Sequence, residues 1–460
     1  MKNMTLEQMA KAVCGELHIE GKADLEKEAT CVVVDSRLIE EGGVFVATVG
    51  ERVDGHSFIP QVMEKGALCA ICEKSPEVYA GPYILVKDSF KALKDLAAYY
   101  RNQLDIKIVG IIGSVGKTST KEIVAATLSA HYNVLKTQGN FNNEVGVPLT
   151  ICRIREEHEV AVVEMGISDF GEMTRLGKIV RPDAVVMTNI GPCHLEKLID
   201  LDGVLKAKTE VFDQMADNGI IVLNKEDEKL STVNNKRQIV FYGAGSDVYA
   251  DEIKGLGLIG TEFTLHVHGD SIKAKVNLPG GHMVINSLAA AVIGSEMGLT
   301  LTEIASGIAK AEGLSGRCNL INMPDYLIVD DCYNANPKSM RAAIDLMKDA
   351  FSRKVTILGD MFELGEDENK LHAQIGEYAI ENGIDLLVCV GKISKSMFEA
   401  ACAKRDEMGA DTEVLYFSSL GELEEIIKNP DKTFIKKNDT VLIKASHGMG
   451  FGAIVDILKK

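Results

Sequence analysis

The sequence predicts an α/β protein with three domains, and three observations lead to that prediction. The chain has 460 residues, enough for about three domains of ordinary size. A β-branched strand, a glycine turn and a helix start follow one another at residues 106–120. Two series of short apolar segments lie on either side of a glycine-containing linker at residues 313–317. Such segments are typical of parallel strands that helices cover on both faces.

Residues 1–85 predict a small α/β domain in which short strands alternate with helices. Strands are expected at residues 32–34, 44–47 and 69–72. The pairs Gly42-Gly43 and Asp54-Gly55 mark turns between them.

Residues 86–314 predict a central domain with a parallel sheet. An amphipathic helix is expected at residues 89–104, where apolar side chains recur at helical spacing. Residues 247–278 instead alternate apolar and polar side chains, which predicts antiparallel strands appended to this sheet. The parallel strands are expected at residues 106–111, 160–163, 184–187, 220–223 and 239–241.

Residues 315–460 predict a third domain of the doubly wound, Rossmann-like type, because apolar strands again alternate with helical segments. Its strands are expected at residues 327–329, 355–358, 386–390, 414–417 and 441–443.

Composition narrows the classes of partner. The net charge of −17 argues against nucleic acid as the main partner. No apolar run approaches the roughly 20 residues of a membrane span, and the polar start of the chain indicates no signal peptide. The ten cysteines are scattered through apolar segments, and Cys69-x-x-Cys72 lacks the second pair that a zinc site needs. We therefore expect reduced thiols and a cytoplasmic location.

The glycine turn at residues 113–118 reads Gly-Ser-Val-Gly-Lys-Thr and predicts a phosphate-binding loop. Backbone N–H groups at the start of a helix attract phosphate, Lys117 would reach the outer phosphates, and the Thr118 hydroxyl would bind Mg²⁺. The loop is shorter than the strict phosphate-loop motif, so a plain glycine turn before a helix remains the alternative.

Two strands after this loop end in residues that suit a metal site. Glu164 closes the strand at 160–163, and His194 follows the strand at 184–187. An acid that caps a helix and a histidine in an ordinary loop are the alternatives. Lys208 is expected near the start of the next helix, where a solvated lysine is the default interpretation. A neutral lysine amine can also add CO₂, and the resulting carbamate would offer oxygen ligands to a second Mg²⁺.

Together these residues resemble the Mur ligases of peptidoglycan synthesis. The resemblance rests on Gly113–Thr118, Glu164, His194 and Lys208, with Gly139-Asn-Phe-Asn-Asn143 and Gly146–Thr150 between them. It is strongest for the members that join D-Ala-D-Ala to UDP-N-acetylmuramoyl-tripeptide. The segments Asp330–Met340, Leu358–Gly365, Leu371-His372, Val34–Arg37 and Gly50–His56 carry this finer likeness, which covers essentially the whole chain.

The resemblance implies an ATP-dependent amide ligase with three parts. A uridine-nucleotide-binding domain would occupy residues 1–85, an ATPase domain of the phosphate-loop type residues 86–314, and a Rossmann-like domain residues 315–460. ATP would phosphorylate the carboxylate of UDP-N-acetylmuramoyl-tripeptide, and the amine of D-Ala-D-Ala would attack the acyl phosphate. Two Mg²⁺ ions and a CO₂-derived carbamate on Lys208 would assist. The resemblance also implies a cytoplasmic monomer that serves cell-wall formation and hence cell shape and division.

The resemblance also assigns site residues. The catalytic set would be Lys117, Glu164, His194 and Lys208. Thr118 and Glu164 would bind the first Mg²⁺, and Glu164, His194 and carbamylated Lys208 the second. ATP contacts would come from Gly113, Ser114, Gly116, Lys117, Thr118, Ser119, His282, Asn286, Arg317, Asp331, Tyr333 and Asn334. Substrate contacts would come from Ser36, Arg37, Arg52, Thr137, Asn142, Asn143 and Asn336.

Several interpretations stay open. His282 and Asn286 could line a surface rather than face adenine, Asp360 and Glu363 could shape the cleft without touching substrate, and His372 is more often structural than catalytic. The family usually has Lys-Gly-Ser-Arg near its C-terminus. Lys444 and Ser446 are kept here, but His447 stands in place of the arginine. A sister ligase that adds one amino acid, a folate polyglutamate synthase and a nucleotide-binding protein without catalysis are the alternative functions.

Overall fold

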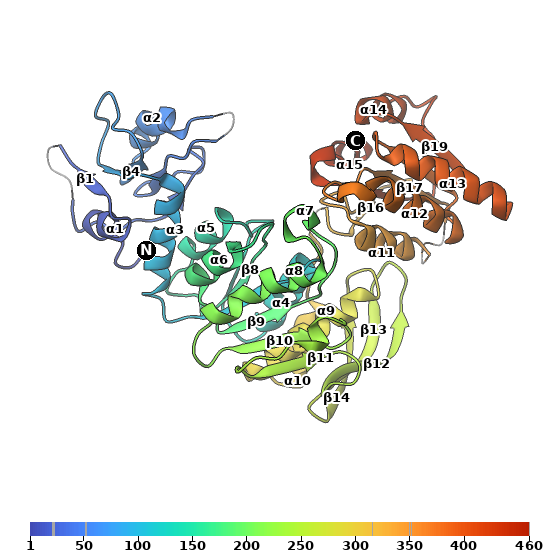
Figure 1. The fold of residues 1–460 in the computed structure, drawn as a ribbon, viewed down its shortest axis with the longest axis horizontal. Coiled ribbons are helices and arrows are strands. Elements are labelled where there is room, and N and C mark those ends of the chain that lie inside the picture. The colour runs from blue at the N-terminus through green and yellow to red at the C-terminus, as the bar shows by residue number, and fades with distance from the viewer. Residues whose placement is uncertain (21–23, 51–52, 315, 349, 351, 460) are drawn as a thin grey trace.

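The computed structural model describes residues 1–20, 24–50, 53–314, 316–348, 350 and 352–459. It consists of three α/β units, and the central unit lies between and below the N-terminal and C-terminal units in the view of Figure 1. The predicted fold class, with three parts and largely parallel sheets, is confirmed.

The N-terminal unit is a five-stranded sheet in the order β1-β5-β4-β3-β2, in which only β1 is antiparallel to its neighbour. The strands predicted at residues 32–34, 44–47 and 69–72 are present, whereas β1 and β5 were not predicted. Both are three residues long and only partly buried, so they carry little apolar signal. The elements are α1 Leu6–Ala12, β1 Glu16–His18, β2 Val32–Val33, β3 Val44–Val46, α2 Ile59–Glu64, β4 Cys69–Cys72 and β5 Tyr83–Leu85.

The central unit is built on a six-stranded parallel sheet in the order β11-β10-β9-β6-β8-β7. Successive residues of β6 are buried in different cores. Ile108 and Ile112 join a cluster with helices α3, α5 and α6, whereas Val109 and Ile111 join a cluster with α4 and α9. Helices thus cover both faces, as the continuous apolar strands predicted. The elements are α3 Ser89–Arg101, β6 Lys107–Ile112, α4 Lys117–Leu128, β7 Val134–Lys136, α5 Gly146–Cys152, β8 Val160–Glu164, α6 Glu172–Val180, β9 Ala184–Met187, α7 Leu195–Leu198, α8 Leu201–Thr209, β10 Ile220–Asn224 and β11 Ile239–Tyr242.

Two expectations for the central unit were wrong. The antiparallel strands of residues 247–278 are not appended to the parallel sheet but form a separate three-stranded sheet that packs on α9 and α10. Their inward side chains, such as Phe263 and Leu265, share a core with those helices. Lys208 lies in the last turn of α8 rather than near its start, because Asp200 caps that helix earlier in the chain. The further elements are β12 Val248–Gly255, β13 Thr261–Val267, β14 Asp270–Val276, α9 His282–Glu296 and α10 Leu301–Ala309.

The C-terminal unit is a six-stranded sheet in the order β15-β16-β20-β17-β18-β19, with helices on both faces. Only the edge strand β15 is antiparallel, and it was not predicted. The elements are β15 Asn319–Asn322, β16 Leu327–Asp330, α11 Pro337–Met347, β17 Lys354–Gly359, α12 Glu368–Glu381, β18 Leu386–Val390, α13 Ser394–Met408, β19 Glu413–Phe417, α14 Leu420–Lys428, β20 Thr440–Lys444 and α15 Gly452–Leu458.

The order of the central strands determines where a ligand can bind. Strand β6 lies between β8 and β9. The chain therefore adds β7 and β8 on one side of β6 and then crosses to add β9 on the other side. Parallel sheets bind ligands at the carboxyl ends of strands where such a reversal opens a crevice. The phosphate loop follows β6, Glu164 ends β8, and Thr188-Asn189 follow β9, so all three lie at this point.

Candidate active site

A cavity of about 740 Å³ lies between the central and C-terminal units. One wall comes from the phosphate loop, Asn142, Glu164 and the start of α9, and the opposite wall from the segment after β16 and the start of α11. Of the predicted site residues, the cavity brings together Ser114, Gly116, Lys117, Thr118, Ser119, Asn142, Asn143, Glu164, His194, Lys208, His282, Asn286, Arg317, Asp331, Tyr333, Asn334 and Asn336.

The phosphate loop has the backbone of an anion-binding turn. Gly113 has φ +140°, and a Cβ there would lie 2.0 Å from Thr188 Oγ1, so only glycine fits. Gly116 has φ +81° and accepts the first helical hydrogen bond of α4, from Thr120 N at 2.9 Å. The N–H groups of residues 117–119 therefore have no acceptor within the helix and are available to phosphate.

Lys117 folds back over this loop. Its Nζ donates to Gly113 O at 3.0 Å and to Ser114 O at 3.2 Å. Burial lowers the pKa of Lys117, while the charge of Glu164 opposes that shift. A ligand phosphate at the loop would offer the ammonium group a stronger, charged acceptor than these carbonyl groups.

Glu164 is the buried centre of the predicted first metal site. Its Oε1 accepts hydrogen bonds from Thr118 Oγ1 at 3.2 Å and Asn142 Nδ2 at 2.8 Å. Its Oε2 is buried and has no hydrogen-bond partner among the residues that the structure describes. Buried oxygen atoms of a carboxylate seldom lack a partner, and a hard cation such as Mg²⁺ binds oxygen ligands. The residues present therefore fit Mg²⁺.

His194 and Lys208, the remaining predicted ligands, are in different states. His194 Nδ1 lies 2.9 Å from Glu363 Oε2 of the C-terminal unit, and burial lowers the pKa of the imidazole. Lys208 is 1% exposed, and its side chain forms no hydrogen bond or ion pair with another described residue. Burial, with the charge of Lys117, lowers the pKa of Lys208 to about 8. A substantial fraction of this amine is therefore neutral near pH 8.

The predicted adenine-binding residues lie beside the phosphate loop. His282 and Asn286 stand one turn apart at the start of α9, and a Cβ on Gly116 would lie 3.6 Å from Asn286 Oδ1. Among the described residues, the side-chain amide of Asn286 donates only to Met283 Sδ, at 3.7 Å. Its amide is therefore free to bind a polar ligand at the cavity wall.

The C-terminal wall carries a buried ion pair. Lys444 Nζ lies 2.6 Å from Asp331 Oδ2 and donates to Asn334 O at 2.9 Å. The guanidinium of Arg317 lies 4.0 Å from the centre of the Tyr333 ring. The His447 ring also contacts Tyr333, with 5.2 Å between the two ring centres. Lys444 thus supports Asp331 and the segment beside it, and His447 contacts an aromatic ring where the family usually has arginine.

Four predicted residues do not line the cavity. A fifth lines it, but its side chain forms hydrogen bonds with backbone N–H groups. Gly113 is not among the residues that line the cavity. Thr137 is fully buried, and its Oγ1 accepts from Glu164 N at 3.0 Å. Ser36 and Arg37 lie in the N-terminal unit. Asn143 lines the cavity, but its Oδ1 accepts from the N–H groups of Val145 and Gly146 at the start of α5. Arg52 lies outside the described residues.

The structure gives partners to three residues whose roles were open. Asp360 is 5% exposed and accepts from Ser394 N and Oγ at 2.7 and 2.6 Å, so it caps α13 and shapes the chain. His372 is fully buried between Met361 N, at 2.8 Å, and Glu368 O, at 2.7 Å, so it is structural. Glu363 contacts His194, which lines the cavity.

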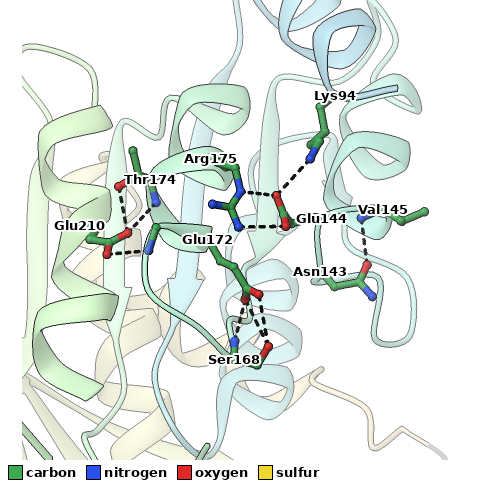
Figure 2. A network of polar contacts seen from close by, with 10 residues as sticks. Lys94, Asn143, Glu144, Val145, Ser168, Glu172, Thr174, Arg175 and Glu210 are labelled. Atoms are coloured by element: carbon green, nitrogen blue, oxygen red, sulfur yellow. Dashed lines mark hydrogen bonds and ion pairs between the residues drawn. The ribbon is translucent and has the colours of Figure 1, made fainter. Parts of the chain in front are cut away.

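The loop that carries Asn142 and Asn143 is held from outside by a network that sequence reasoning missed. In Figure 2, Glu144 lies between Lys94 of α3 and Arg175 of α6. Its carboxylate accepts from Arg175 Nε at 2.6 Å and Nη2 at 3.1 Å. Glu210 in turn accepts from Thr174 N and Oγ1 beside Arg175. The loop is thereby anchored to two helices of the central unit.

Sequence reasoning also missed Lys121 and gave no role to Thr188 and Asn189. Asn189 Oδ1 accepts from Val115 N at 3.1 Å, which fixes the phosphate loop. Its place at the end of a predicted strand was the available signal. Lys121 lies four residues after Lys117 on α4 and is fully buried. That spacing on one helical face was the only sequence signal for it.

Two absences concern the described residues alone. Within them, no group of three His, Cys, Asp or Glu side chains could hold a metal ion by itself. Among the same residues, we find no helix with the length and apolar character needed to cross a membrane.

Comparison with known proteins identifies the family. The Mur ligase family catalytic domain matches residues 28–126, the Mur ligase middle domain residues 111–294, and the Mur ligase glutamate ligase domain residues 316–447. The UDP-N-acetylmuramoyl-tripeptide–D-alanyl-D-alanine ligase of Escherichia coli is 37% identical over 87% of this chain and 89% of its own length. This chain belongs to the Mur ligase family.

Solved structures of Mur ligases agree. MurF from Acinetobacter baumannii has a TM-score of 0.88 and 32% identity, with 99% of each chain covered. MurF ligase from Thermotoga maritima, solved in complex with ADP, has a TM-score of 0.79 and 28% identity over 93% of this chain and 97% of that one. The likeness therefore extends over all three units.

Proposed function

We propose that this protein is an ATP-dependent amide ligase that joins D-Ala-D-Ala to UDP-N-acetylmuramoyl-tripeptide in the synthesis of peptidoglycan precursors. The observation that carries the proposal is the meeting of three strand ends at one cavity. There an anion-binding loop, a hydroxyl and a carboxylate with an unpartnered oxygen face residues of a second unit. The similarity to ligases with this substrate pair over most of the chain supports the same assignment.

The carboxylate of the tripeptide substrate is a poor electrophile, so it must be activated before an amine can attack it. An oxygen of the substrate carboxylate bonds to the terminal phosphorus of ATP, and ADP leaves. The amine of D-Ala-D-Ala then bonds to the carbonyl carbon, phosphate leaves, and the amine loses a proton. Lys117 and the helix N-terminus beside it offset the charge that repels the two anions.

Thr118 and Glu164 would hold one Mg²⁺, and Glu164, His194 and Lys208 a second. Bound Mg²⁺ screens phosphate charge and orients the transferred group. For the second ion, Lys208 must become an oxygen ligand. Its neutral amine would add CO₂ and release a proton to give the carbamate, and its lack of a partner and its pKa of about 8 favour that reaction. With Nδ1 on Glu363, His194 would offer its other ring nitrogen, Nε2, to the metal ion.

We also propose a division of labour among the units. Residues 1–85 would bind the uridine nucleotide through Ser36, Arg37 and Arg52. Residues 86–314 would bind ATP, with further ATP contacts from Asp331, Tyr333 and Asn334. Residues 315–460 would bring D-Ala-D-Ala to the ATP site, and Asn336 would contact substrate. We propose that the protein acts as a cytoplasmic monomer, and that cell shape and division depend on it.

The deciding experiment measures phosphate release with Mg²⁺, ATP, UDP-N-acetylmuramoyl-tripeptide and D-Ala-D-Ala, each omitted in turn. The tripeptide is supplied in its lysine and diaminopimelate forms. Release that needs every component, with the pentapeptide product identified by mass, would establish the ligase. Release with a single amino acid in place of the dipeptide would indicate a sister ligase. No release with any acceptor would favour a nucleotide-binding protein without catalysis.

A further inference from the structure

Lys121 is a buried cation that the proposed mechanism does not use. It lies on α4 and is fully buried. Its Nζ donates to Thr137 O at 2.9 Å and to Gly139 O at 3.4 Å, and lies 3.0 Å from Glu122 Oε1. An ammonium group has three N–H donors, and these three acceptors account for all of them.

Glu164 Oε2 lies 3.9 Å from Lys121 Nζ. This distance is too long for a hydrogen bond but short for two opposite charges in a buried place. Glu164 Oε2 therefore experiences the charge of Lys121 while its lone pairs remain free, in agreement with its lack of a hydrogen-bond partner. A direct hydrogen bond from the ammonium group would instead compete with a metal ion for that oxygen.

Lys121 also holds the backbone beside Glu164. Its bonds to the carbonyl groups of Thr137 and Gly139 tie the segment after β7 to α4. Thr137 Oγ1 accepts from Glu164 N, and the same segment leads to Asn142, which donates to Glu164 Oε1. Both the backbone and the side-chain position of Glu164 thus depend on groups that Lys121 anchors.

We propose that Lys121 is a positioning residue for the divalent cation of the nucleotide complex. It neutralises and orients Glu164 from behind while leaving Oε2 available to the cation. The inference rests on the proposed function because it takes Glu164 to be a metal ligand.

Lys136 provides a matched control. It also pairs with Glu122, through the other carboxylate oxygen, but its side chain is 48% exposed and no contact joins it to Glu164. Lys121→Gln keeps a hydrogen-bond donor and removes the charge, and Lys121→Arg keeps the charge. Lys121→Met fills the space of the lysine stem and is the second neutral variant, in case the glutamine variant does not fold.

The experiment measures the affinity of the full-length protein for ADP, once with EDTA and once with saturating Mn²⁺. Mn²⁺ should raise the affinity for ADP by a certain factor in the wild-type protein. We expect this factor to be smaller by about tenfold or more in each folded neutral variant, because the charge beside Glu164 is gone. Affinity with EDTA should stay within about twofold. Lys121→Arg and Lys136→Gln should keep most of the increase.

An equal loss of ADP affinity with and without Mn²⁺, or the same loss in Lys136→Gln, would overturn the proposal and indicate a merely structural lysine. A wild-type protein whose ADP affinity ignores Mn²⁺ would overturn it too. Since no acceptor substrate is present, failure of the proposed ligation would appear only in the phosphate-release assay and would leave this result standing.

Discussion

At the scale of single residues, the site depends on buried charges whose partners are incomplete. Glu164 has one satisfied oxygen and one without a partner, and Lys208 has none among the described residues. Buried polar groups are usually paired, because an unpaired one costs free energy. Their exposure to a shared cavity indicates that a ligand supplies what the chain lacks.

Lys208→Ala should reduce turnover by about 100-fold or more, because it would remove the proposed ligand of the second Mg²⁺. If a carbamate supplies the ligand oxygens, a short-chain carboxylic acid such as acetate should restore part of the activity. Turnover of the variant is measured by phosphate release against acetate concentration. Lys206→Ala is the control, because Lys206 lies on the same helical turn but its ammonium group lies over the Phe170 ring. This variant should keep its turnover, and acetate should not change it. Absence of rescue at every concentration would contradict the carbamate.

Glu303 should make stability depend on pH. Hydrogen bonds from Thr300, with a further one from His131, lower the pKa of Glu303 from 4.5 to about 2. The ionised carboxylate therefore stabilises the fold above pH 4.5, and this contribution is lost as the pH falls toward 2. Glu303→Gln should lower the free energy of unfolding at pH 7, and the difference from wild type should shrink below pH 4.5. Urea unfolding at several pH values measures it.

Glu40→Gln serves as the comparison, because Glu40 is exposed and its carboxylate binds no other described residue. A constant difference between Glu303→Gln and wild type from pH 7 to pH 3.5 would contradict this account.

At the scale of elements, the phosphate loop depends on its neighbour as much as on its own sequence. Thr188 Oγ1 donates to Val115 O at 2.6 Å, and Ser114 Oγ exchanges hydrogen bonds with Gly191. The segment after β9 therefore holds the turn after β6 in a shape that glycine alone permits at residue 113.

Gly113→Ala should destabilise the protein by about 1–3 kcal/mol and abolish nucleotide binding, because the new Cβ would collide with Thr188 Oγ1. Thermal unfolding and ADP binding measure the two effects. Gly245→Ala is the matched variant, since Gly245 also has a positive φ, +78°, but nothing lies within 4 Å of its Cβ position. If Gly113→Ala bound ADP normally, the tight fit of this loop would not be required.

At the scale of the whole molecule, the cavity has walls from two units, and we propose that they move together and apart during catalysis. The contact between His194 and Glu363 already joins the central and C-terminal units. The segment 313–317 connects them, and of it residue 315 lies outside the described residues. Closure would exclude water from the acyl phosphate, which water otherwise destroys.

Small-angle scattering should show a smaller radius of gyration when ATP analogue and UDP-N-acetylmuramoyl-tripeptide are both bound than with either alone. Each ligand would join two units, so closure needs both. Gly313–Arg317 is our proposed hinge. Identical scattering profiles in all states would count against a closing motion.

Local pattern alone was enough to predict the three-part α/β class, most strands, the phosphate loop and the strand ends that carry Glu164 and Asn189. Each of these depends on side-chain periodicity or on residues adjacent in the chain. Short or half-exposed strands such as β1 and β15 escaped, since few of their side chains are buried.

Only the folded chain assigned the roles that depend on distant partners. It placed the Asp360 carboxylate at the start of α13, His372 between two backbone groups, and the Thr137 hydroxyl against the N–H of Glu164. It also brought Lys121 within 3.9 Å of Glu164, across 43 positions of sequence. The residue type determines which bonds a side chain can form. Long-range packing determines its partners and its exposure to water. These two properties decide whether the side chain binds a ligand or supports the fold.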